Sequence, residues 1–154
     1  MAAQAQQVAT LLPLLVGAVA VLCTIVIHAL AVDTTVRLVR HERRLGRAGK
    51  SFWGNVAIVA TAISIAFVAH LVEIAFWAML FMRCGEFTDF GTAFDHSAVN
   101  YTTLGYGNVV MTPSWRLLGP LEAADGMLMF GVTTALVFTV IQRLIVTQFP
   151  DLRD

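Results

Sequence analysis

Three long runs of apolar residues, separated by polar stretches, dominate the pattern of this chain. They cover about residues 11–32, within an N-terminal segment 1–36, and residues 53–82 and 114–146. An α-helix rises about 1.5 Å per residue, so about 20 apolar residues cross the roughly 30 Å hydrocarbon core of a bilayer. The pattern therefore predicts three transmembrane helices. The second and third are long enough to tilt or to extend beyond the core.

A shorter, mildly apolar stretch at residues 92–102 lies between the second and third runs. It begins with Thr92, a residue type that caps helices, and it precedes residues 103–107, which contain two glycines. Glycine adopts positive φ angles that other residues avoid. Non-helical backbone at membrane depth must be buried in protein or line a water-filled cavity. We therefore expect a short re-entrant helix followed by a non-helical loop.

The composition is that of a membrane protein. Hydrophobic residues make up 58% of the chain and charged residues 13%, and the mean hydropathy is +0.76. Soluble domains are about 45–50% apolar and about 25% charged. The net charge is +0, so no overall field favours nucleic acid. The sequence shows no nucleophile–base set, zinc-ligand spacing or phosphate-binding loop, so we predict neither an enzyme nor a cofactor.

The expected linker between the first and second runs, residues 37–52, is strongly basic. The segment between the second and third runs carries only Arg83 and Arg116 beside three acidic residues. Basic loops of membrane proteins stay in the cytoplasm. We therefore expect the linker and a tail at 148–154 inside, and the N-terminus and residues 103–107 outside, in the plasma (inner) membrane. The basic residues of the linker are Arg37, Arg40, Arg43, Arg44, Arg47 and Lys50.

Four arginines of this linker recur every three or four residues, as in a basic stripe on one face of a helix. They are Arg37, Arg40, Arg44 and Arg47. Two interpretations are open. One is the ordinary basic bias of cytoplasmic loops, and the other is an interfacial helix that binds anionic lipid headgroups. Gly46 and Gly49 disfavour a long helix in this segment.

The residues from Thr103 to Gly107 read Thr-Leu-Gly-Tyr-Gly. Potassium-channel filters are built from four loops that read Thr-Val-Gly-Tyr-Gly. The flanking elements follow the matching order, with an expected outer helix at 53–82, a pore helix at 92–102 and an inner helix at 114–146. Residues 53–147 therefore resemble the pore module of the tetrameric potassium-channel family.

This resemblance implies an all-α membrane protein in which three transmembrane helices and a re-entrant pore helix assemble as a homotetramer. Each copy would supply one quarter of a cage of peptide carbonyls that replaces the water shell of K⁺. The permeant ion is the only ligand implied, and the expected function is passive, potassium-selective conduction. The filter residues are Thr103, Leu104, Gly105, Tyr106 and Gly107, with K⁺ at the first four.

The resemblance also implies a glycine hinge in the inner helix. Gly126 and Gly131 are the candidates, and close helix packing is the alternative role for both. Met127, Phe130 and Thr134 follow at spacings of three and four residues. They are expected to line a cavity below the filter, with an ordinary helix–helix core as the alternative.

Several residues depart from the family pattern. Leu104 replaces the commoner valine and Asn108 the usual aspartate, while Asp95 and His96 stand where the family often has two tryptophans that clamp the filter tyrosine. Asp95 or His96 is thus the expected hydrogen-bond partner of the Tyr106 hydroxyl. These departures, and the additional first helix, leave two alternatives open: a weakly selective cation channel, and a non-conducting subunit or sensor.

Ionisable residues within the apolar runs are functional candidates because their burial in a membrane is costly. His70 and Glu73 lie one turn apart in the second run, and Glu122 and Asp125 in the third. One interpretation is that these residues form hydrogen-bonded pairs that brace the pore helix, and the other is a proton-sensitive gate. We expect His28 in the first run to form an interhelical hydrogen bond.

Overall fold

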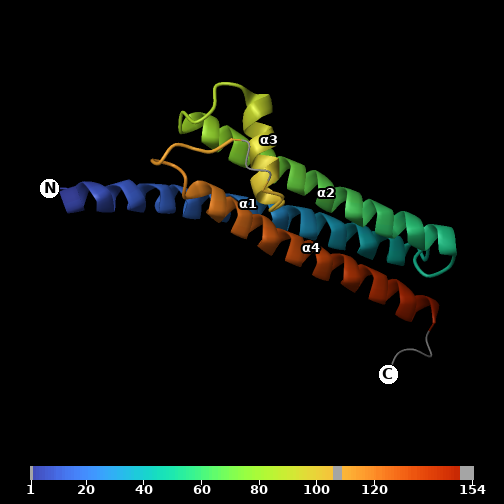
Figure 1. The fold of residues 1–154 in the computed structure, drawn as a ribbon. Coiled ribbons are helices and arrows are strands. Elements are labelled where there is room, and N and C mark those ends of the chain that lie inside the picture. Colours follow the sequence, from blue (N-terminus) through green and yellow to red (C-terminus); the bar gives the residue numbers. More distant parts are fainter. Residues whose placement is uncertain (1, 106–108, 150–154) are drawn as a thin grey trace. The chain divides into compact units, whose positions relative to one another are not determined.

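The computed structural model describes residues 2–105 and 109–149, with side chains from residue 10 onward. It contains four helices, α1 (Ala2–Arg44), α2 (Phe52–Arg83), α3 (Phe90–Tyr101) and α4 (Leu118–Gln148), and the described residues form no strand (Figure 1). The predicted all-α class is therefore confirmed. Helices α1, α2 and α4 are each long and apolar enough to cross a membrane, as the three apolar runs predicted.

The first helix extends further than the sequence suggested. Residues 37–44, assigned to the basic linker, continue α1, and only residues 45–51 separate it from α2. An i,i+4 pair between Asp33 and Arg37, 2.6 Å apart, supports this helical extension. The helix ends where Gly46 adopts a φ of 65°. The prediction that the four arginines form one stripe on a helix is therefore wrong, because Arg47 lies beyond the end of α1.

The fourth helix begins later than expected. Residues 113–117, included at the start of the predicted inner helix, form turns instead. The amide groups of Trp115 and Arg116 donate to the carbonyl of Thr112 at 3.1 and 3.0 Å, and the amide of Leu118 donates to Trp115 at 2.9 Å. These bonds close turns immediately before α4, so the regular helix starts only at Leu118.

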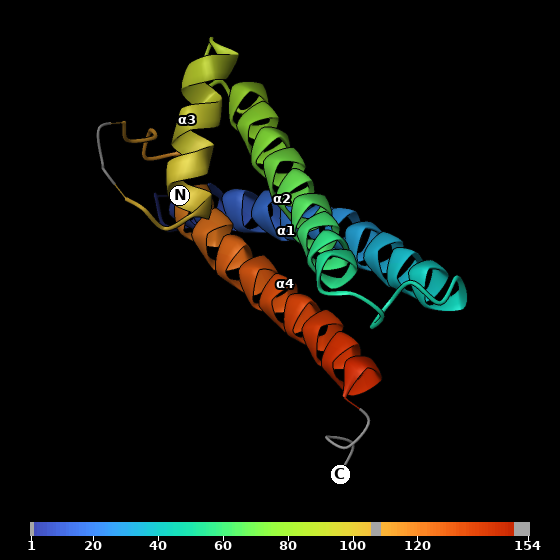
Figure 2. The same cartoon turned by 90° about the vertical axis from the view of Figure 1, so that its right-hand side faces the viewer.

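The chain divides into two compact units. The first contains Met1–Ile27 and Leu71–Met129, and the second contains His28–His70 and Phe130–Asp154. The first unit holds all of α3, which lies beside the C-terminal part of α2 (Figure 2). It therefore also holds the loop that carries the predicted filter.

The core of the first unit shows where the additional first helix packs. Trp77, Phe81 and Tyr101 are fully buried in one apolar cluster, which Ala20 of α1 joins. Three residues before Ala20, a Cβ atom at Gly17 would lie 2.5 Å from Leu121 Cδ1 of α4. Small residues thus let α1 pack closely against this unit.

The second unit has its own apolar cluster, formed by Val39, Ala48, Ile58, Val140 and Leu144. A polar junction accompanies it. The Nε2 atoms of His28 and His70 lie 3.2 and 3.0 Å from the hydroxyl oxygen of Thr133. The interhelical hydrogen bond predicted for His28 is therefore confirmed, and one threonine hydroxyl joins α1, α2 and α4.

Candidate functional site

The helix α3 leads directly into the predicted filter, and its start is set by Asp89. The Asp89 carboxylate accepts hydrogen bonds from the amide and the hydroxyl of Thr92, at 2.8 and 3.0 Å. These bonds favour the ionised carboxylate and lower the pKa of Asp89. The predicted cap Thr92 is therefore wrong: Asp89 is the N-cap, because its side chain reaches the amide three residues further on.

The end of α3 is closed by the first filter residues. The amide of Thr103 donates to Asn100, and the amide of Leu104 donates to Val99, both at 2.9 Å. This is the hydrogen-bond pattern of a Schellman motif, which usually has glycine at the left-handed position. Here that position is Thr103, with a φ of 57°, the only positive value among the non-glycine residues described. Such a conformation is strained for a β-branched residue.

The direction of the filter carbonyls follows from these amide bonds. The amide of Gly105 also turns back toward Val99, at 3.4 Å, and Gly105 has a φ of 65°. In a planar trans peptide the carbonyl points opposite to the amide of the next residue. The carbonyl groups of Thr103 and Leu104 therefore point away from α3.

The described filter residues are open to the surroundings in the single chain. Thr103 and Gly105 are exposed, and Leu104 is 54% exposed. Tyr106, Gly107 and Asn108 lie outside the described residues, so the roles expected for them stay predictions.

Two buried carboxyl groups, one on α2 and one on α4, hold α3. The Tyr101 hydroxyl donates to Glu73 of α2, and the Ser97 hydroxyl donates to Glu122 of α4. All four residues have 0% exposure. The Ser97 hydroxyl also lies 2.8 Å from the carbonyl of Ile74. The interpretation of Glu73 and Glu122 as braces of this helix is confirmed, whereas a proton-sensitive gate stays a prediction.

Asp125 joins three helices in the same unit. Its Oδ2 atom accepts from the hydroxyl of Thr24 in α1 at 2.8 Å and from the indole nitrogen of Trp77 in α2 at 3.0 Å. Neither donor was singled out in the sequence. A buried tryptophan nitrogen needs an acceptor, so Trp77 within an apolar run was a usable signal. The hydroxyl of Thr24 gave no such signal, because threonine often bonds within its own helix.

The two candidate hinge glycines differ in their surroundings. A Cβ atom at Gly126 would lie 2.0 Å from the carbonyl oxygen of Tyr101, whereas one at Gly131 would have no atom within 4 Å. Gly126 thus meets the end of α3 directly, which favours the close-packing alternative. The expected cavity residues Met127, Phe130 and Thr134 are all exposed in the single chain.

Asp95 and His96, which stand where the family often has tryptophans, differ in burial. Asp95 is exposed, whereas His96 is buried against the rings of Phe81 and Phe87. The Nε2 atom of His96 lies 3.0 Å from the side-chain nitrogen Nδ2 of Asn100. Their expected bond to Tyr106 involves a residue outside the described part of the chain.

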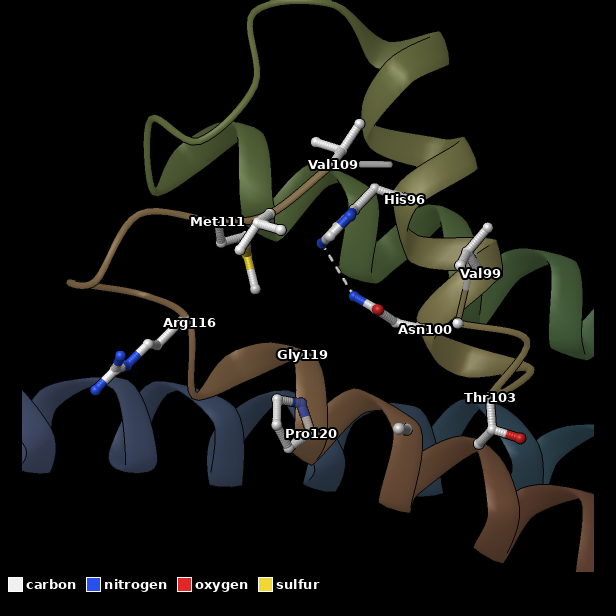
Figure 3. A pocket seen from close by; sticks show the side chains of 12 residues that line it. His96, Val99, Asn100, Thr103, Val109, Met111, Arg116, Gly119 and Pro120 are labelled. Atoms are coloured by element: carbon white, nitrogen blue, oxygen red, sulfur yellow. Dashed lines mark hydrogen bonds between the residues drawn. The ribbon is translucent and has the colours of Figure 1, made fainter. Parts of the chain in front are cut away.

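Beside the filter lies a hollow of about 400 Å³ (Figure 3). The linked side chains of His96 and Asn100 border it from α3, and Gly119 and Pro120 border it from α4. Val109, Met111 and Arg116 complete its rim from the segment between the filter and α4.

Glu86 holds the segment after the predicted filter through hydrogen bonds to Thr112. One of its carboxylate oxygens accepts from the amide of Thr112 at 2.7 Å, and the other accepts from the Thr112 hydroxyl at 2.6 Å. The loop before α3 is thereby tied to the loop after the filter. In the sequence Glu86 stood out only as a charge, since its partner lies 26 residues away.

The helices and the loop together define an α-helical membrane protein with a short capped helix that leads into the predicted filter segment. A family model described as "Ion channel" matches residues 67–143, half of the chain. The chain therefore belongs to this ion-channel family, which confirms the resemblance to a potassium-channel pore module. The family is one of channels and not of enzymes. Comparisons with curated proteins and with solved structures find no match.

Proposed function

We propose that four copies of this chain form a potassium-selective channel in the plasma membrane. The observation that carries the proposal is the backbone after α3, where the amides of Thr103, Leu104 and Gly105 turn toward the helix. The carbonyl groups of Thr103 and Leu104 then point outward, as a ring of ion ligands requires. The carbonyl groups of Gly105 and Tyr106 would continue the same row.

One chain provides only one wall of such a cage. A dehydrated K⁺ needs several carbonyl oxygens to replace its water shell, and Thr103, Leu104 and Gly105 are exposed within the described part of the chain. Three further copies around a fourfold axis would complete the cage. The exposed Met127 would line the cavity below it.

Weak cation selectivity is the second candidate. It is favoured by Asp95 and His96, which stand in place of the tryptophans common in the family. Reversal potentials in opposing potassium and sodium gradients separate the two candidates. A shift that follows the potassium gradient alone supports the first, and equal responses to both ions support the second.

The direct test is flux from the purified full chain in liposomes. We expect barium-blockable rubidium uptake driven by a potassium gradient. We also expect Gly105→Ala to abolish selective uptake, because alanine disfavours the φ of 65° that orients the carbonyls. Gly85→Ala is the matched control, since Gly85 has a φ of 79° and a Cβ atom there would meet nothing within 4 Å.

Both substitutions introduce similar backbone strain, on the order of 1 kcal/mol. Only one of them lies in the filter. Wild-type selectivity in the Gly105→Ala channel would overturn the filter assignment. A particle without fourfold symmetry, seen by native mass measurement and electron microscopy, would overturn the assembly.

A further inference from the structure

We propose that Glu73 and Glu122 are positioning residues for the selectivity filter, which they control through the end of α3. This inference rests on the proposed potassium-channel function. Both carboxyl groups are fully buried, and each accepts a hydrogen bond from an α3 side chain. Neither residue belongs to the filter segment, so their effect on the ion is transmitted through α3.

Tyr101 is the residue through which this control acts most directly. It is the last residue of α3, two positions before Thr103, and it is completely buried. Its hydroxyl is held by Glu73 of α2, and its carbonyl oxygen packs against Gly126 of α4. Tyr101 is therefore held at both ends, the ring against one helix and the backbone against another.

Ser97 provides a second anchor one turn earlier. Positions 97 and 101 are four residues apart, so they lie on the same face of α3. That face is buried at both residues. Both hydrogen bonds lie in a fully buried site, and its low polarity strengthens them. The two hydrogen bonds thus fix both the rotation of α3 about its axis and its position along that axis.

The position of α3 passes to the filter through the backbone. The carbonyls of Val99 and Asn100 accept the amide hydrogens of Leu104 and Thr103. A shift of the helix end would therefore move the strained Thr103 and its neighbours as one body. Binding sites of this kind need ligand positions accurate to about 0.5 Å, so loss of an anchor should reduce ion selectivity before it abolishes conduction.

The decisive variant is Tyr101→Phe, which removes one oxygen atom and keeps the ring. We expect the ratio of potassium to sodium permeability to fall about tenfold, which corresponds to about 1.4 kcal/mol. We expect Glu73→Leu to lower the permeability ratio to a similar extent. Glu73→Gln keeps an acceptor oxygen and should therefore retain most of the selectivity. The combined Tyr101→Phe and Glu73→Leu change should cost no more than either alone, because both remove one interaction.

A second measurement reports on position without using selectivity. Hydrogen exchange on the intact tetramer should show the amides of Thr103 and Leu104 exchanging at least about tenfold faster in Tyr101→Phe, with the Thr92 amide at the start of α3 unchanged. Thr61→Val is the control for hydroxyl removal, because the Thr61 hydroxyl bonds to Ala57 of its own helix. It should alter neither readout.

The two measurements separate the possible failures. A selective wild-type channel whose Tyr101→Phe variant keeps its permeability ratio overturns the positioning role, whatever the exchange rates show. Unchanged exchange rates in Tyr101→Phe overturn it as well. An unselective wild-type channel whose variant shows faster exchange overturns the proposed potassium function, while it supports control of the filter segment by Glu73.

Discussion

Gly126→Ala tests how closely α4 must approach the end of α3. A Cβ atom at this position would lie 2.0 Å from the carbonyl oxygen of Tyr101 and 2.9 Å from its carbonyl carbon. Both atoms belong to the backbone, so no side-chain rotation can relieve the clash. Contacts below 3.0 Å are not tolerated at a Cβ atom, so α3 and α4 must separate locally by at least 1.0 Å.

The energetic effect has two opposing parts. Overpacking of a close contact costs about 1–3 kcal/mol, and replacing a helical glycine by alanine returns up to about 1 kcal/mol. We therefore expect a net loss of stability of about 1–2 kcal/mol. The displacement is larger than the roughly 0.5 Å tolerance of a binding geometry, so selectivity should fall together with stability.

Gly131→Ala is the matched control, because a Cβ atom there would meet nothing within 4 Å. Thermal unfolding of the detergent-solubilised protein measures stability, and reversal potentials in liposomes measure selectivity. We expect the Gly126→Ala protein to unfold at a lower temperature than the wild type and to lose selectivity. The Gly131→Ala protein should unfold at or above the wild-type temperature.

The hinge interpretation of Gly126 makes a different prediction. A hinge glycine replaced by alanine should change the open probability and leave stability and selectivity at wild-type values. That result would refute the packing argument and return Gly126 to the role of a gating residue.

Two further predictions concern α1. Thr24→Val should lower the melting temperature of the protein by removing the bond from α1 to Asp125, with a loss of about 1.5 kcal/mol, near the upper end for polar contacts in membranes. An unchanged melting temperature would mean that α1 is held by apolar packing alone. We also propose that the exposed Arg40 and Arg44 bind anionic lipid headgroups, so that replacing both by glutamine weakens the binding of an anionic lipid to the detergent-solubilised protein by about 1 kcal/mol per residue at low salt. Equal binding of a neutral lipid would leave only the general basic bias of the segment.

The elements of the pore module could be predicted well from the sequence. Long apolar runs define spanning helices because the bilayer sets their length, and residues 103–107 form a local string that resembles a channel filter. The helix boundaries were less accurate. The cap at Asp89 and the extension of α1 to Arg44 depend on single hydrogen bonds and on where a glycine ends the helix, and a pattern of apolar positions contains neither.

The support of the filter was predicted only in outline. Buried ionisable residues were expected to brace the pore helix, but their partners were not identified. Asp95 and His96 were favoured because the family has tryptophans there, and of these Asp95 is exposed. The bond of Asp95 or His96 to Tyr106 stays a prediction, whereas Glu73 and Glu122 are seen to hold α3.

The sequence alone determined that this is an all-helical membrane channel with a filter-like loop after a short helix, because apolar length and glycine-containing strings act over a few neighbouring residues. The tertiary structure decided which polar groups meet. Tyr101 pairs with Glu73 across 28 positions, and Thr24 pairs with Asp125 across 101. Such pairs depend on the register in which whole helices pack, and that register is set by the summed fit of their surfaces, which no local pattern contains.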